Sequence, residues 1–269
     1  MADVAFHTAT TVDEALALVG DGSDARVVAG GSDLVVQARG GRQLPANVVA
    51  IHRIAELHGL VAGDELVLGA LVSHAEICAD AAVRSTWTAL ADASALVGSH
   101  ATRNVGTVGG NLMNASPAME TGGPLVVLGA RVELRSAAGS RELGVEELWT
   151  GPGRTAAQPG ELLTRVVVPR PADRSGSAYV RLEYRRAMEI AIVGASACVT
   201  LADDGGVAAC RVALTALAPT IIRSPAAEAA VVGTAGDEAA LAAAQAGAAA
   251  DALAPTIAIS IARRYSSRT

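Results

Sequence analysis

A polar segment at residues 169–177, with the sequence PRPADRSGS, divides this chain into two parts of different character. Its prolines and serines, with no apolar period, are typical of a connection between domains. Three strand candidates and then two alanine-rich helix candidates follow it, at 178–186, 190–201, 207–217, 226–231 and 238–253. Strands followed by helices predict an α+β module. We therefore expect an α+β protein with domains over 1–173 and 174–269, the second built on a three-stranded antiparallel sheet.

The part before this segment contains shorter elements. Two apolar strands flank one helix, at 26–29, 34–39 and 47–51, and predict a small βαβ unit. Later strand candidates, two pairs of which form hairpins, lie at 60–62, 66–68, 131–135, 141–145 and 162–168. Two capping-box spacings, which mark the starts of helices, lie at Thr11 with Glu14 and at Ser73 with Glu76. Helix candidates lie at 15–19 and 87–97. The change of pattern near residue 57 predicts two subdomains, 1–56 and 57–173.

The composition excludes several functions. All 21 basic side chains among the 269 residues are arginines, so the chain has no lysine for a Schiff base or a Walker-type phosphate loop. The net charge of −6 argues against a nucleic-acid binder. No apolar run is long enough to span a membrane, and the first residues lack the apolar run of a signal peptide. We expect a cytoplasmic protein with no membrane span and, because only 2% of residues are aromatic, an aliphatic core.

Metal-binding residues show no usable spacing. The three cysteines are far apart and cannot form an iron–sulfur site alone, which predicts reduced structural thiols at Cys78, Cys198 and Cys210. The five histidines also lack ligand spacing, so we expect structural or surface roles for His7, His52, His58, His74 and His100. We therefore expect no metal site in this chain.

Two glycine pairs are the strongest candidates for a binding site. Each follows a short apolar segment, at 29–33 (AGGSD) and 107–111 (TVGGN). Adjacent glycines lack Cβ and accept positive φ, so their backbone amides can face an anion closely. Either pair taken alone is better explained as a tight turn. Neither has the glycine spacing of a Rossmann dinucleotide fingerprint.

The second glycine pair lies among unusually many short polar side chains. Four of them, with one arginine just upstream, occupy Asn104, Thr107, Asn111, Asn114 and Arg103. This is more hydrogen-bonding capacity than a connection needs. Together the two pairs predict a site that grips a pyrophosphate from two sides.

These residues carry a resemblance to a known family. The segment ATRNVGTVGGNLMNASPAME, 101–120, resembles the flavin loop of the FAD-binding medium subunit of the molybdenum hydroxylases, such as xanthine dehydrogenase, aerobic carbon monoxide dehydrogenase, and nicotine and ketone dehydrogenases. The segment VVAGGSDLV, 27–35, resembles the first flavin loop, and 128–169 and 179–199 are also similar to the family. The resemblance implies a PCMH-type FAD-binding domain of two subdomains, then a CO-dehydrogenase-flavoprotein-type C-terminal domain. It also leads us to expect a shortened final helix.

The resemblance further implies roles for individual residues. Both glycine loops would bind the FAD diphosphate, with Arg26 just before the first. Glu120, where relatives commonly have aspartate, would contact the sugar portion, and Leu162 or Leu163 would border the ring. Arg181 would contact the flavin where lysine is commoner. The expected cofactor-binding residues are Arg26, Val27, Val28, Ala29, Gly30, Gly31, Ser32, Asp33, Leu34, Thr102, Asn104, Val105, Thr107, Val108, Gly109, Gly110, Asn111, Ser116, Glu120, Leu162, Leu163, Tyr179 and Arg181.

The family resemblance implies an electron-transfer function. The chain would take electrons from the [2Fe–2S] clusters of a small partner subunit and pass them to a terminal acceptor, while a molybdopterin-containing large subunit hydroxylates the substrate. We expect no catalytic residue in this chain. Two alternatives stay open: a free-standing FAD-dependent oxidase or dehydrogenase, and a non-enzymatic scaffold subunit that has lost FAD.

Overall fold

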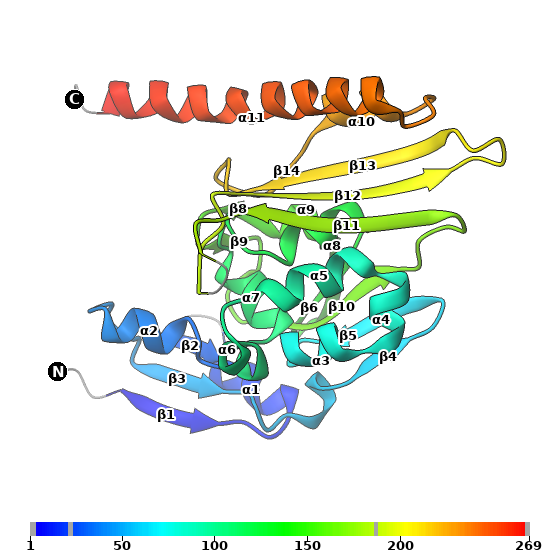
Figure 1. Cartoon of the computed structure of the whole chain (residues 1–269). Coiled ribbons are helices and arrows are strands. Elements are labelled where there is room, and N and C mark those ends of the chain that lie inside the picture. Colours follow the sequence, from blue (N-terminus) through cyan, green and yellow to red (C-terminus); the bar gives the residue numbers. More distant parts are fainter. Residues whose placement is uncertain (1–3, 21–23, 186–187, 267–269) are drawn as a thin grey trace.

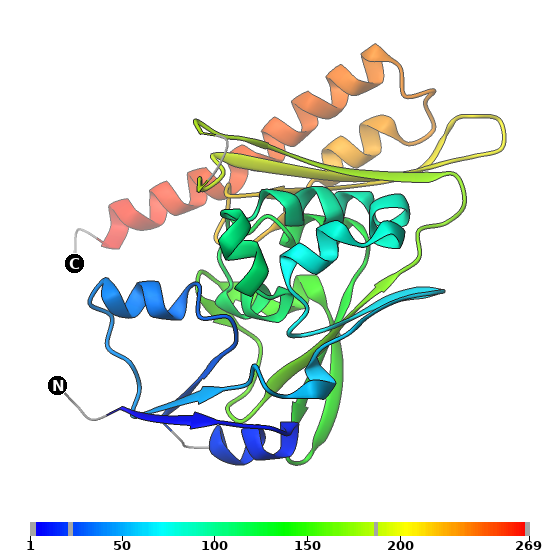
Figure 2. The same ribbon diagram turned by 60° about the horizontal axis from the view of Figure 1, so that its bottom comes forward.

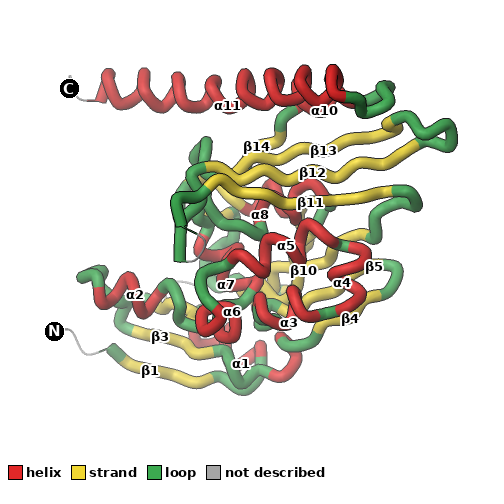
Figure 3. The backbone as a smooth tube through the Cα atoms, in the orientation of Figure 1, coloured by secondary structure: helices red, strands yellow, loops and turns green. Residues whose placement is uncertain are grey.

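Three larger sheets follow one another along the chain in the computed structural model, which describes residues 4–20, 24–185 and 188–266, and β8 (Trp149–Gly151) and β9 (Arg154–Thr155) form a further two-stranded sheet (Figure 1). The N-terminal sheet lies at the bottom of Figure 1, and the C-terminal sheet lies near the top beneath a long helix. Short helices fill the space between, as the tube in Figure 3 makes clear. The expected α+β class is confirmed.

The N-terminal sheet is parallel, with strand order β1-β3-β2. Its elements are β1 (Ala5–Thr8), α1 (Val12–Leu18), β2 (Ala25–Val28), α2 (Leu34–Arg39) and β3 (Asn47–Ala50). The predicted βαβ unit is present, since β2 and β3 pair in parallel with Val27 opposite Val49. The sequence did not predict β1, which adds a strand on the other side of β3.

Helix α1 begins earlier than the predicted range 15–19. The Thr11 hydroxyl accepts a hydrogen bond from the amide of Glu14 at 3.1 Å, as an N-cap does. The reciprocal half of the predicted capping box is shifted by one residue, because the Glu14 carboxylate accepts from the amide of Thr10 at 2.7 Å. The helix can therefore start at Val12, which is buried.

The central sheet is antiparallel, with order β4-β5-β10-β6-β7. Its strands are β4 (Leu60–Ala62), β5 (Glu65–Gly69), β6 (Arg131–Ser136), β7 (Gly139–Gly144) and β10 (Leu162–Pro169). Strand β10 lies in the middle, where Val166 pairs with Leu68 on one side and Val132 on the other. Both predicted hairpins and the predicted strand 162–168 are confirmed.

Six short helices lie between β5 and β6 in the sequence, and smaller elements lie beside the strands. The helices are α3 (His74–Ala79), α4 (Ala81–Thr86), α5 (Thr88–Leu96), α6 (His100–Val105), α7 (Val108–Asn114) and α8 (Gly122–Val127). The smaller elements are a 3-10 turn η1 (Ala55–Leu57), α9 (Val145–Leu148), β8 (Trp149–Gly151) and β9 (Arg154–Thr155). The capping box of Ser73 and Glu76 is confirmed, with both reciprocal hydrogen bonds present.

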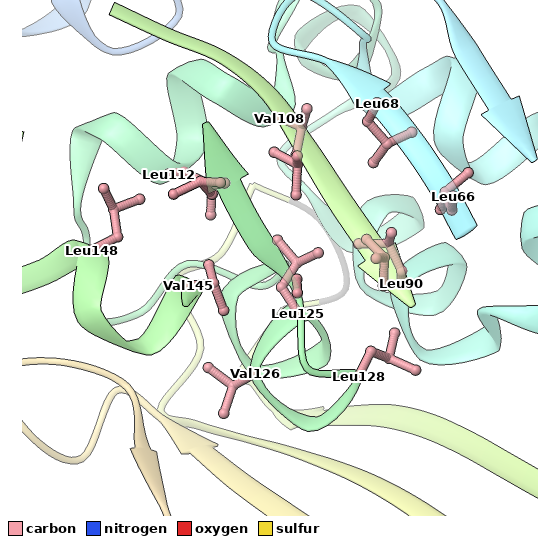
Figure 4. Packing of buried hydrophobic residues seen from close by; sticks show 14 of the residues in the cluster. Leu66, Leu68, Leu90, Val108, Leu112, Leu125, Val126, Leu128, Val145 and Leu148 are labelled. Atoms are coloured by element: carbon pink, nitrogen blue, oxygen red, sulfur yellow. The ribbon is translucent and has the colours of Figure 1, made fainter. Parts of the chain in front are cut away.

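The main core lies between these helices and the sheet, and it is aliphatic as predicted (Figure 4). Leu68 from β5, Leu112 from α7 and Leu125 from α8 are fully buried in it. Two buried tryptophans join this cluster and bond their indole N–H groups to backbone carbonyls: Trp87 to Pro169 at 2.9 Å and Trp149 to Leu112 at 3.0 Å. Because each indole nitrogen has an acceptor, burying it carries no penalty for an unmade hydrogen bond.

The C-terminal sheet is antiparallel, with order β11-β12-β13-β14. Its elements are β11 (Ser175–Leu182), β12 (Val193–Leu201), β13 (Val207–Thr215), β14 (Ile222–Arg223), α10 (Pro225–Val231) and α11 (Glu238–Ser266). The first two strands differ from their predicted ranges because the chain leaves the ladder after Leu182 and rejoins it at Val193. Arg186, at the end of the predicted strand 178–186, lies outside the described residues. Helix α11 extends past the predicted end at 253 and crosses the outer side of the sheet (Figure 1).

Candidate functional site

A cleft of about 1050 Å³ lies between the β2–α2 loop and helices α6 and α7. Residues from 25–37 and 97–120 form much of its lining, and residues from 153–163 and 188–190 complete it. Figure 2 shows α2 beside these central helices, although the two regions are far apart in sequence. Small-molecule sites are typically about 300–1,000 Å³, so this cleft suits a large ligand.

The first glycine pair forms a loop whose amides are free. The loop joins β2 to α2, and Gly31 has a φ of +72°, which favours glycine. Gly30 lies against α6, where a Cβ would come within 1.6 Å of the Val105 carbonyl oxygen. Within the described part of the chain, the amides of Gly30, Gly31, Ser32 and Asp33 have no hydrogen-bond acceptor. Successive unpaired amides of this kind make an anion-binding concavity.

Arg26 supplies positive charge next to this loop. It lies on β2, lines the cleft, and has no carboxylate partner among residues 4–20, 24–185 and 188–266. Burial and then the nearby Arg42 lower the pKa of Arg26, but a guanidinium stays charged at neutral pH. An unpaired cation beside free amides favours a phosphate group.

The second glycine pair is not a loop, which corrects the sequence prediction. Gly109 and Gly110 lie in the first turn of α7, and Thr107 caps that helix by accepting from the Gly110 amide at 3.1 Å. The amides of Val108 and Gly109 donate to Val72 and Ala70 carbonyls at 2.9 and 3.0 Å. These amides are already used inside the protein, so only the first loop offers a run of free donors.

The two glycines of α7 also differ in their surroundings. A Cβ on Gly109 would lie 2.7 Å from the Ala70 carbonyl oxygen, so glycine is needed there for packing. A Cβ on Gly110 would meet only the side chains of Thr107 and Ala29, at 3.0 and 3.9 Å. The absence of a side chain at Gly110 therefore leaves space in the cleft, whereas its absence at Gly109 lets α7 pack closely against Ala70, which follows β5.

Polar side chains at the cleft are oriented by hydrogen bonds. The buried Thr121 hydroxyl donates to Asn111 Oδ1 at 2.5 Å, which leaves the Asn111 amide nitrogen to donate elsewhere. Asn114 Nδ2 donates to Asp33 Oδ1 at 3.1 Å, and Gln37 Nε2 donates to Asn114 Oδ1 at 3.3 Å. These last two bonds join α7 to the first glycine loop and to α2.

His74 lines the cleft although the sequence gave it only a structural or surface role. It is 1% exposed, and its Nδ1 has no hydrogen-bond partner in the described part of the chain. Burial, and then the positive charge of Arg103, lower the pKa of His74 to about 4. The imidazole is therefore neutral at physiological pH. The exposed His100 does not line the cleft.

Glu120 places a buried carboxylate in the cleft wall. The residue is 8% exposed, and its Oε1 accepts from Arg181 Nη1 at 2.6 Å. Burial raises the pKa of Glu120, and the Arg181 charge opposes that rise. Tyr179, two residues before Arg181 on β11, is also buried, and burial followed by the charge of Glu120 raises its pKa to about 12.

The structure brings most of the predicted residues together. Those that line the cleft are Arg26, Val27, Val28, Ala29, Gly30, Gly31, Ser32, Asp33, Leu34, Thr102, Val105, Thr107, Gly109, Gly110, Asn111, Ser116, Glu120, Leu162 and Leu163. Asn104, Val108, Tyr179 and Arg181 do not line it. Val108 faces the main core, and Arg181 lies behind Glu120.

Other lining residues carry little signal in the sequence. They are Ala25, Val36, Gln37, Ile51, Ala70, His74, Val97, Gly98, Ala101, Gly106, Met113, Asn114, Ala118, Met119, Gly153, Thr155, Glu161, Met188, Glu189 and Ile190. Most are small or apolar residues that come from separate segments. Asn114, which belongs to the polar group around the second glycine pair, could have been found from the sequence.

Two searches of the described residues complete the description. No group of three histidine, cysteine, aspartate or glutamate side chains there is placed to hold a metal ion. No helix in those ranges has the length and apolar character needed to cross a membrane.

The cleft has the features that an FAD needs. The loop at 29–33 and Arg26 can hold a diphosphate without a lysine. Asn111 and Glu120 offer a fixed donor and a fixed acceptor, and Leu162 and Leu163 add an apolar wall. The fold and this cleft define a protein that binds a dinucleotide cofactor.

Comparison with known proteins agrees with this class. Residues 2–171 match the family described as the FAD binding domain in molybdopterin dehydrogenase, and residues 177–260 match the CO dehydrogenase flavoprotein C-terminal domain. The chain therefore belongs to the FAD-binding medium subunits of the molybdenum hydroxylase family, which are oxidoreductase subunits.

The relatives and the solved structure described next have similar sequence identities to this chain. A putative xanthine dehydrogenase FAD-binding subunit of Escherichia coli is 30% identical over 83% of this chain and 77% of the relative. The nicotinate dehydrogenase FAD-subunit of Eubacterium barkeri is 33% identical over 77% and 72%. A carbon monoxide dehydrogenase structure from Hydrogenophaga pseudoflava has a TM-score of 0.87 at 30% identity, covering 92% of this chain and 86% of that one.

Proposed function

We propose that the cleft binds FAD with its diphosphate on the 29–33 loop and Arg26, and its sugar portion near Glu120. The observation that carries this placement is a run of four amides that find no acceptor, and an arginine that finds no carboxylate partner, among the residues that the structure describes. A diphosphate anion matches both features, because charge-assisted hydrogen bonds to phosphate oxygens are the strong ones. The membership of residues 2–171 in an FAD-binding family supports FAD as the ligand.

The residues around the ring position orient it and exclude water. Leu162 and Leu163, at the start of β10, are buried and provide an apolar wall. The Asn111 amide nitrogen, held in place through Thr121, is a fixed donor toward the cleft. When bound, FAD supplies one- and two-electron chemistry. The other predicted residues that line the cleft act by position, as backbone or side-chain contacts around the cofactor.

The function we propose is electron transfer within a larger complex. The chain would take electrons from the [2Fe–2S] clusters of a small subunit, while a molybdopterin-containing large subunit acts on the substrate. Relatives named as FAD-subunits and medium chains support this assignment. The reduced cofactor would then be reoxidised by a terminal acceptor.

The test starts from the purified chain alone. We expect a yellow protein with one FAD per chain and no iron–sulfur absorption. Reduced [2Fe–2S] small subunit should bleach the flavin absorbance under anaerobic conditions, whereas aldehydes or N-heterocycles added to the isolated chain should not. Turnover of such substrates by the chain alone would refute the relay and support a free-standing oxidase or dehydrogenase. A colourless protein that takes up no added FAD would support a scaffold subunit.

A further inference from the structure

Arg181 connects the C-terminal domain to the cleft without reaching the cleft itself. It lies on β11, and its side chain is 1% exposed. Its Nη1 donates to Glu120 Oε1 at 2.6 Å and to the Leu96 carbonyl at 3.1 Å, while its Nε donates to Glu183 Oε2 at 2.5 Å. One guanidinium therefore joins the cleft wall, the end of α5 and the segment that follows β11.

Other contacts already hold the C-terminal sheet against the rest of the protein. Helix α8 approaches β12 so closely that a Cβ on Gly123 would lie 2.5 Å from the Ser196 hydroxyl. Arg211 on β13 pairs with Glu146 on α9 at 2.9 Å, on a partly exposed surface. Contacts other than those of Arg181 thus also hold the two domains together. Arg181 differs from them because it contacts a residue of the cleft wall, Glu120.

The position of the Glu120 carboxylate depends on charge. The charged groups that act on it are Arg181 and Glu183, and the neutral phenol of Tyr179 lies on the same strand as Arg181. Without Arg181, two carboxylates would be left in a largely buried place with no cation between them. A carboxylate in that position takes up a proton or turns toward water, because burying an unpaired charge is costly.

We propose that Arg181 is a positioning residue that fixes the Glu120 carboxylate at the cleft wall, so that FAD retention depends on the pairing of the two domains. This inference rests on the proposed placement of FAD. It differs from the direct flavin contact that the family resemblance implies for this position, because Arg181 does not line the cleft and its hydrogen bonds to described residues go to Glu120, Leu96 and Glu183.

A double-mutant cycle on the full-length chain tests the proposal. The variants are Arg181→Met, Glu120→Gln and the two together, and the measurement is the dissociation constant for FAD. In metal sites, removing a group that orients a ligating side chain typically costs about 10- to 100-fold in affinity, and we take the lower end of that range as the guide here. We expect at least a tenfold loss from Arg181→Met, and a change of less than about twofold when Arg181→Met is added to Glu120→Gln.

Two further variants separate positioning from general stability. Arg211→Met removes a matched arginine–glutamate pair between the same domains and should leave FAD affinity unchanged. Arg181→Lys keeps a cation at the same place and should recover most of the affinity lost in Arg181→Met. If Arg181→Met does not fold, Arg181→Lys replaces it in the double-mutant cycle. We then expect a smaller loss of FAD affinity, and no loss when Arg181→Lys is combined with Glu120→Gln.

The pH dependence of FAD affinity is a measurement that a purely structural role of Arg181 would leave unchanged. Protonation of Glu120 removes an acceptor for the cofactor, so FAD affinity should fall as the pH falls through the pKa of Glu120. Without Arg181 this fall should move to higher pH, since the arginine charge opposes the rise that burial causes in that pKa. In Glu120→Gln the fall should be absent.

Different results would overturn different conclusions. Wild-type affinity in Arg181→Met, or additive losses in the cycle, would refute the positioning role, the latter by showing that Arg181 acts independently of Glu120. Equal losses of FAD affinity in Arg181→Met and Arg211→Met would show that the effect comes from domain docking, and would also refute the positioning role. If the wild-type chain takes up no FAD, or if Gly110→Val retains it in full, the placement of the cofactor fails instead.

Discussion

Gly30→Ala is the substitution for which the structure makes the sharpest prediction. The new Cβ would lie 1.6 Å from the Val105 carbonyl oxygen and 2.5 Å from its carbon, while real Cβ atoms essentially never come within 3.0 Å of such atoms. The neighbour is backbone at the end of α6 and cannot rotate away. The 29–33 loop must therefore move away from α6 by more than an ångström.

The size of the effect follows from that displacement. Overpacking of this kind costs about 1–3 kcal/mol, which for a domain of this size lowers Tm by about 2–12 °C. A hydrogen bond to a charged group is worth about 1.5–3 kcal/mol, so loss of two amide–phosphate bonds would weaken FAD binding by more than about 100-fold. Stability and cofactor binding should therefore fall together.

Gly110→Val is the matched variant, and thermal unfolding of the apoprotein and the FAD-to-protein ratio are the measurements. No backbone atom outside its own helix turn lies within 4 Å of a Cβ at Gly110, so the larger side chain should extend into the cleft. We expect a Tm close to wild type and loss of bound FAD. A Gly30→Ala protein with wild-type Tm and a full complement of FAD would refute the reasoning.

Three further predictions follow from single contacts. Thr121→Val removes the donor that orients Asn111 and should weaken FAD binding by about tenfold at a stability cost of about 1–3 kcal/mol, as equilibrium titration and urea unfolding would measure. His74 has a folded-state pKa of about 4 against 6.5 when unfolded, so its contribution is complete above pH 6.5 and is lost as the pH falls toward 4. His74→Gln should remove roughly 3 kcal/mol of this pH dependence, and equal slopes in both proteins would contradict that. Glu65→Gln breaks an exposed pair with Arg131 and should change the free energy of unfolding by less than about 1 kcal/mol.

The two glycine pairs show how far local sequence can predict a binding site. Both pairs were predicted as loops whose backbone amides can face an anion. Whether an amide is free depends on which carbonyl lies opposite it, and Ala70 and Val72 reach the start of α7 only through the folded chain beside β5. No carbonyl of the described residues accepts from the amides of the first pair, so these amides are free there.

The surroundings of single residues in the site also depend on segments that are distant in the sequence. His74 looked like an ordinary histidine because its role depends on burial beside Gly106 and Arg103, from another helix. Arg181 was expected at the flavin because of its place in a family pattern. In the structure its guanidinium contacts two carboxylates and a carbonyl, and a sequence does not say which partner a long side chain reaches.

The sequence by itself determined the α+β class, the aliphatic core, most strands, the capped start of α3 and the family. These depend on periodicity, on the spacing of capping residues and on contiguous motifs, which act within a few residues of the chain. Only the tertiary structure decided which glycine amides are available, how the chain from 100 to 117 becomes two short helices, and which groups Arg181 contacts. Those outcomes depend on contacts between segments distant in sequence, where burial and a single facing carbonyl or carboxylate set the result.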